Sequence, residues 1–232
     1  MNQYHTPTVA AHSDELSRAK FIKNTYLHVG YAILGFIAVE YFLINHTSLG
    51  QLMLKFISQS SYMWLAVLGG FMGISYISQS MADSASSKGM QYAGLALYVV
   101  GESIIFLPLL LMATLYSPDA IPQAAIATGG LFMALTVIAF TTKKDFSFLG
   151  GLLKVGFIVS LGLIIASAIF GFNLGIIFSG VMVILAAASI LYSTSNIIHR
   201  YDTSQYVAAS IGLFAGIATL FWYILRIVMS RD

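Results

Sequence analysis

The sequence contains no cysteine among its 232 residues, and only 9% of those residues are charged. The absence of cysteine excludes disulfides, thiol catalysis, iron–sulfur clusters and cysteine-ligated zinc. Soluble domains carry about 25% charged residues, so the scarcity of charge excludes an ordinary water-soluble domain. The net charge is only +2 and the basic residues form no single patch, so the sequence gives no support to nucleic-acid binding.

Apolar sequence is what the chain has in abundance, at 58% of its residues. Long apolar segments predict seven membrane-spanning helices, at about 25–44, 61–81, 91–115, 121–141, 147–170, 173–197 and 205–229. Backbone groups in lipid must bond within their own segment, so runs of this length are helical. The expected fold class is therefore all-α integral membrane, with a polar tail (1–24) and a single seven-helix domain (25–232).

Lysine and arginine predict the orientation, because they concentrate on the cytoplasmic side of a membrane. With the N-terminus in the cytoplasm, seven basic residues lie inside and three outside, which favours that orientation and an external C-terminus. The inside set is Arg18, Lys20, Lys23, Lys88, Lys143, Lys144 and Arg200, and the outside set is Lys55, Arg226 and Arg231.

Two charged residues lie inside predicted spans, where an ionisable group is a functional candidate. At 1.5 Å per residue, Glu102 lies about 16 Å and Lys154 about 10 Å from the cytoplasmic ends of their helices. We therefore expect either a buried Glu102–Lys154 pair or a shared cytoplasm-facing cavity. Alternatively, Lys154 extends to the interface while Glu102 stays protonated or bonds to a neighbouring hydroxyl.

Other polar and small residues suggest contacts between helices. Glu40 and Arg226 lie near the outer ends of the first and last spans and could meet at the outer rim. Two glycine pairs have the GxxxG spacing that allows helices to approach closely, Gly69 with Gly73 and Gly212 with Gly216.

The sequence lacks the residue patterns of intramembrane enzymes. The last span contains no lysine for a retinal Schiff base, and every aspartate falls in a loop or tail. The histidines are scattered without a metal-binding i, i+4 pair, and no nucleotide-binding fingerprint occurs. We therefore predict a protein that is not an enzyme, with no cofactor and no metal site.

Three stretches resemble the Bax inhibitor-1 family: LFMALTVIAFTTKKDFSFLGG (131–151), ILYSTSNIIH (190–199) and LFWYILRI (220–227). The segments KNTYL (23–27), TSNIIH (194–199) and SRD (230–232) are similar to its bacterial YccA-like branch. The resemblance implies six helices packed around a central C-terminal helix. It also implies a location in the bacterial inner membrane.

The resemblance implies one of two activities. Some members leak calcium or protons through a gate of two aspartates, whereas the YccA-like branch modulates the membrane-anchored AAA+ protease FtsH and its HflK–HflC partner. Ser193 and Gly216 stand where the family keeps those aspartates, so the acidic gate should not carry over. The first hypothesis is a protease modulator with residues 1–24 as its handle. The alternative is a pH-sensitive leak lined by Glu102, Lys154, Ser193 and Thr194.

Overall fold

The computed structural model describes residues 9–83, 87–142 and 144–231 of the chain. Residues 1–8 of the predicted tail, the connector residues 84–86 and Lys143 of the predicted inside set lie outside the described residues. A short 3₁₀ turn, η1 (Ala10–His12), precedes the helices α1 (Glu15–His46), α2 (Leu49–Ser58), α3 (Ser61–Ala82), α4 (Lys88–Tyr116), α5 (Ala120–Thr141), α6 (Leu149–Phe170), α7 (Gly175–His199) and α8 (Tyr206–Met229). All but α2 are long and apolar enough to cross a membrane, which confirms the seven predicted spans.

Helix α1 begins at Glu15 rather than at residue 25. Asp14 caps it, because its carboxylate accepts the backbone N–H of Ser17 at 2.9 Å. These hydrogen bonds from Ser17 hold the pKa of Asp14 below its usual value. The polar residues 15–24 therefore extend the first span as helix, and the boundary predicted at residue 24 falls within a continuous α1.

Helix α2 lies between the first two predicted spans, where the sequence analysis placed no helix. Its less exposed positions are Leu49, Gly50, Met53, Leu54 and Ile57, which share one helical face. A Cβ at Gly50 would lie 2.8 Å from Cδ2 of Leu111, so α2 packs closely on the end of α4. The short helix thus covers one end of the bundle.

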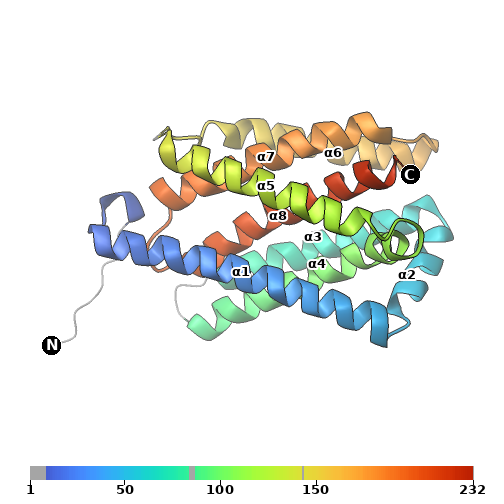
Figure 1. Ribbon diagram of the computed structural model, residues 1–232, viewed down its shortest axis with the longest axis horizontal. Coiled ribbons are helices and arrows are strands. Elements are labelled where there is room, and N and C mark those ends of the chain that lie inside the picture. Colours follow the sequence, from blue (N-terminus) through green and yellow to red (C-terminus); the bar gives the residue numbers. More distant parts are fainter. Residues whose placement is uncertain (1–8, 84–86, 143, 232) are drawn as a thin grey trace.

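Helix α8 lies in the middle of the bundle, where it packs against α1, α3, α4, α5 and α7 (Figure 1). Its small and large side chains are buried together, as at Ala208, Leu213 and Leu220. Helix α6 packs on α7 and α3 and faces α8 across a cavity. The C-terminal helix is therefore central, as the resemblance implied, with α6 the least closely attached of the surrounding spans.

The two predicted glycine pairs have different environments. A Cβ at Gly69 or Gly73 would meet no atom within 4 Å, so the close contact predicted there is wrong: both residues face outward on α3. A Cβ at Gly216 would lie 3.0 Å from Cγ1 of Ile190, which confirms a close contact of α8 with α7. A tighter approach of two backbones occurs at Gly94 of α4, which the spacing rule did not indicate.

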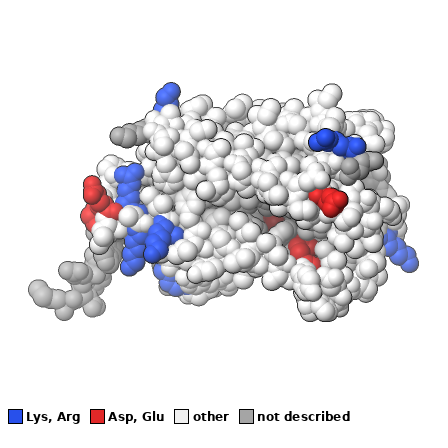
Figure 2. All heavy atoms as spheres, viewed as in Figure 1, with Lys and Arg blue, Asp and Glu red and all other residues white. Residues whose placement is uncertain are grey.

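Charge is distributed as a spanning orientation requires. On the face shown in Figure 2, lysine and arginine side chains lie towards the two ends of the molecule, separated by a broad band without them. The start of α1 and the end of α8 lie at opposite ends of the bundle (Figure 1), as an odd number of spans dictates. The band without lysine and arginine, within which Figure 2 shows a few acidic atoms, matches the part of the surface that lipid would cover.

Candidate functional site

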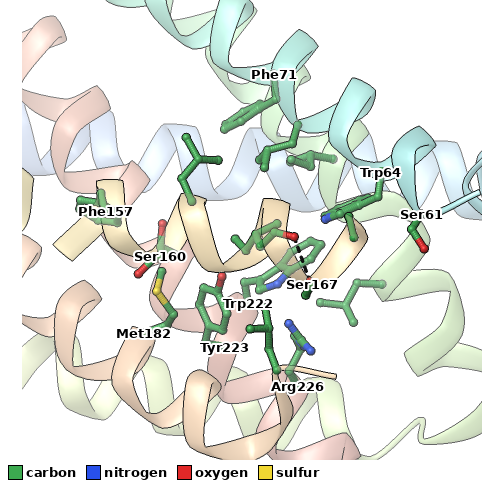
Figure 3. Close-up of a pocket in the computed structure, with 18 of the residues that line it drawn as sticks. Ser61, Trp64, Phe71, Phe157, Ser160, Ser167, Met182, Trp222, Tyr223 and Arg226 are labelled. Atoms are coloured by element: carbon green, nitrogen blue, oxygen red, sulfur yellow. Dashed lines mark hydrogen bonds between the residues drawn. The ribbon is translucent and has the colours of Figure 1, made fainter. Parts of the chain in front are cut away.

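A cavity of about 760 Å³ lies between α3, α4, α6, α7 and α8, and the loop that joins α6 to α7 forms part of its wall. Figure 3 shows that aromatic, hydroxyl and basic side chains from α3, α6 and α8 converge on it: Trp64, Phe71, Phe157, Ser160, Ser167, Trp222, Tyr223 and Arg226. The cavity is a mainly apolar space with a few polar groups, which is the usual character of a ligand site.

Glu102 of α4 lines this cavity and is only 4% exposed. The hydroxyl of Tyr98, one turn earlier on α4, donates a hydrogen bond to its carboxyl group. The other carboxyl oxygen, Oε2, is buried without a hydrogen-bond partner. An unpartnered buried carboxylate costs several kcal/mol when it is charged, so this position favours a proton or an added cation.

The structure does not bring Lys154 to Glu102. Lys154 is exposed on α6, whereas Glu102 is buried in the cavity wall. Helix α4 begins at Lys88, so Glu102 lies about 21 Å along its helix, whereas Lys154 lies about 8 Å along α6. The two residues differ in depth because α4 starts earlier and α6 later than the apolar pattern suggested. Glu102 instead has a neighbouring hydroxyl as its partner.

Glu40 and Arg226 also lie in different environments. Glu40 of α1 is 4% exposed, and neither of its carboxyl oxygens has a hydrogen-bond partner. Arg226 of α8 lines the cavity, which Glu40 does not. No outer-rim contact therefore joins the two side chains, and Arg226 belongs with Glu102 as a wall residue of one site.

Ser193 and Gly216, the two positions at which the resemblance implied aspartates, lie on the facing helices α7 and α8. The hydroxyl of Ser193 donates to the carbonyl oxygen of Gly212 at 3.4 Å. A Cβ at Gly212 would lie 3.9 Å from both the Ser193 and the Tyr201 hydroxyl oxygens. Gly216 lies one turn further along α8 and packs on Ile190, so Ser193 faces Gly212 rather than Gly216.

Thr194 is fully buried and lies beside the hydroxyls of Tyr26 and Thr136. Neither Ser193 nor Thr194 lines the cavity that contains Glu102. The four residues proposed to line a leak pathway therefore do not surround one space in this structure.

The polar end of α7 makes a contact that the sequence reasoning missed. The hydroxyl of Ser195 accepts the backbone N–H of Phe146 at 2.9 Å and donates to Oδ1 of Asp145 at 3.2 Å. The N–H of Ser147, with smaller contributions from Ser195 and His199, lowers the pKa of Asp145. The TTKKDFSFLGG and TSNIIH stretches, which carry the family resemblance, therefore touch each other. In the sequence, the only sign of this contact is that both stretches are polar and lie at helix ends.

Replacing Ser195 with alanine should lower the free energy of unfolding by about 1–2 kcal/mol, because the Phe146 N–H loses its acceptor. Thermal unfolding of the purified protein would measure the change, and amide exchange at Phe146 should accelerate. Ser193→Ala is the matched control, since its hydrogen bond is longer, at 3.4 Å, and its loss should have a smaller effect. Equal stability of Ser195→Ala and Ser193→Ala would contradict a stabilising role for the Ser195–Phe146 hydrogen bond.

The chain before α1 is docked onto the loop between α7 and α8. Within this docked segment (Val9–Ser13), the N–H of Ala10 donates to the carbonyl oxygen of Tyr201 at 2.9 Å, and Val9 forms an antiparallel bridge with Asp202. Ala10 is fully buried. Burial, followed by the charge of nearby Asp83, raises the pKa of Tyr201 to about 12, so its hydroxyl stays protonated.

Seven apolar helices with a buried C-terminal helix define a polytopic membrane protein. The family model described as "Inhibitor of apoptosis-promoting Bax1" matches residues 18–232. The chain therefore belongs to the Bax inhibitor-1 family, a family of non-enzymatic membrane proteins, which confirms the resemblance seen in the sequence.

Relatives occur in bacteria and in a virus. The chain is 29% identical over 225 residues, covering 94% of both chains, to the modulator of FtsH protease YccA of Escherichia coli. It is 32% identical over 164 residues to an uncharacterised protein of Pseudomonas aeruginosa, covering 69% of this chain and 72% of that one. It is 25% identical over 228 residues to a Golgi anti-apoptotic protein of vaccinia virus, covering 93% and 92%.

Proposed function

We propose that this protein modulates a membrane-anchored AAA+ protease of the FtsH type in a bacterial inner membrane. The observation that carries the proposal is the end-to-end similarity to YccA, which is named for its modulation of FtsH. The match extends over 94% of both chains, so it reaches every span at least in part. The resemblance adds HflK–HflC, the partner of that protease, as a further expected component.

The proposed orientation places the N-terminus in the cytoplasm, where the protease would engage it. Within the described residues, the basic positions at the ends of α1, α4, α5 and α7 that share the N-terminal side outnumber those on the opposite side. Among the described residues, the N-terminal side of the chain is held by the docked segment, Val9–Ser13. Residues 9–13 are docked and residues 15–24 are helical, so these parts of the predicted 24-residue handle are held in the fold.

Pulse–chase of a membrane substrate of FtsH tests the modulation itself. Excess of this protein should slow degradation of the substrate at least about twofold, and the tagged protein should co-purify with the protease from native membranes. Unchanged degradation together with no co-purification would overturn the proposed function.

Deletion of residues 2–8 should prolong the half-life of this protein several-fold, because it removes the part of the handle that precedes the docked segment. The deletion leaves Val9–Ser13 and the Asp14 cap of α1 in place, so the fold should be unaffected. The half-life is followed in cells with and without FtsH. A deletion that leaves turnover unchanged in both strains would argue against the tail as a handle.

A further inference from the structure

The cavity contains features that a protease modulator does not require. The chain has two tryptophans, Trp64 and Trp222, and both line the cavity. Their rings stack with centroids 5.8 Å apart, and Phe106 meets Trp222 edge-on at 4.8 Å. The volume of about 760 Å³ falls in the range typical of small-molecule sites. One wall of the cavity is therefore a continuous aromatic surface.

A single buried acid complements this aromatic wall. Glu102 has one carboxyl oxygen without a partner, and the hydroxyl of Tyr98 is the polar side chain beside its carboxyl group. In the described part of the chain, no lysine, arginine or histidine forms an ion pair with it. Glu102 thus has no cationic partner, although Arg226 lines the same cavity, and most of the other wall groups are apolar, aromatic or hydroxyl.

We infer that the cavity binds a hydrophobic amine, an apolar molecule that carries one ammonium group. The ammonium would supply the missing charge to Glu102 and donate a hydrogen bond to Oε2. The faces of Trp64 and Trp222 attract a cation as well as an apolar body. The inference concerns ligand binding and does not depend on the proposed protease.

Arg226 makes an anionic amphiphile the competing occupant. Arg226 lies within the last turn of α8, on the same wall as Trp222, and lines the cavity near the α6–α7 loop. An anion would be attracted to this end, but its charge would be repelled at Glu102. The two ligand classes therefore place their charged groups at different positions, and their affinities separate the alternatives.

The test uses quenching of tryptophan fluorescence by brominated alkyl probes of one chain length: 11-bromoundecylamine, 11-bromoundecanol and 11-bromoundecanoic acid. Both tryptophans report on the cavity, so quenching of the purified full-length protein measures its occupancy. The amine should bind at least about tenfold more tightly than the alcohol, which corresponds to about 1.4 kcal/mol. The acid should bind no more tightly than the alcohol.

Three variants locate the effect at Glu102. Glu102→Gln should reduce the preference for the amine to about twofold or less. Glu40→Gln is the matched control, because Glu40 is equally buried at 4% exposed but lies outside the cavity, and it should keep the preference. Glu102→Asp retains the charge, should retain a preference for the amine, and serves where the glutamine variant does not fold. Equal binding of amine and alcohol, tightest binding of the acid, or equal loss in Glu40→Gln would overturn the inference.

Discussion

The Gly94→Val variant is expected to unfold roughly 6–12 °C below the unsubstituted protein, a loss of about 3 kcal/mol. A Cβ at Gly94 would lie 2.6 Å from the carbonyl oxygen of Ser78 and 2.9 Å from the backbone nitrogen of Ala82. Both neighbours are backbone atoms of α3, and Ser78 and Ala82 are fully buried, so neither can move aside alone. Valine therefore forces α3 away from α4 along a contact that also positions Tyr98 and Glu102.

Gly70→Val provides the control for this prediction. Gly70 lies on α3, is exposed, and a Cβ there would meet no atom within 4 Å. The two substitutions add the same side chain to a helix, so their intrinsic effects on helix formation are alike. Thermal unfolding in one detergent should show a large loss for Gly94→Val and little change for Gly70→Val. Similar melting temperatures for both variants would show that the α3–α4 contact tolerates separation.

The positions of the spans could be predicted from the sequence because each is an uninterrupted apolar run, and lipid forces such runs into helices. The start of α1 could not, because residues 15–24 are polar and their helix depends on the Asp14 cap and on continuity with the span. Helix α2 escaped notice because it is too short to cross a membrane, although its apolar residues have helical spacing.

Close packing was harder to predict than the presence of helices. GxxxG spacing selected Gly69 and Gly73, which face outward, and passed over Gly94 and Gly101, which both face α3. The latter are seven residues apart and thus lie on one face of α4, a signal that a search restricted to four-residue spacing does not detect. Spacing identifies a helix face of small residues, but whether that face packs against another helix or faces outward depends on residues distant in the sequence.

The candidate site was predicted in part. Glu102 was found because an acid within an apolar run has no ordinary structural reason to be there. Its suggested partner, Lys154, was predicted wrongly, because depth along a helix does not determine the direction of a side chain. Lys154 is exposed on α6 and does not face Glu102. The cavity itself depends on α6 packing on α7 and α3 rather than closely on α8, which no local pattern encodes.

Replacing Ala10 with aspartate should release the docked segment and make cleavage within residues 9–14 at least about tenfold faster. Ala10 is fully buried, and an aspartate there would place a charge in an apolar cluster that includes Phe21 and Ile197. A backbone bond to Tyr201 and the Val9 bridge hold the segment, so undocking is far easier than unfolding the bundle. Limited proteolysis of the purified protein measures the release.

Ala11→Asp is the control for that release, because Ala11 is exposed and the same charge there faces solvent. In cells, undocking makes Val9–Ser13 accessible, so Ala10→Asp should shorten the half-life of the protein where FtsH is present, and Ala11→Asp should not. Equal cleavage of the two variants would show that Ala10 does not anchor the segment. If Ala10→Asp shortens the half-life equally in cells without FtsH, the docked segment does not control engagement by that protease. The tail would then stabilise the fold rather than act as a handle.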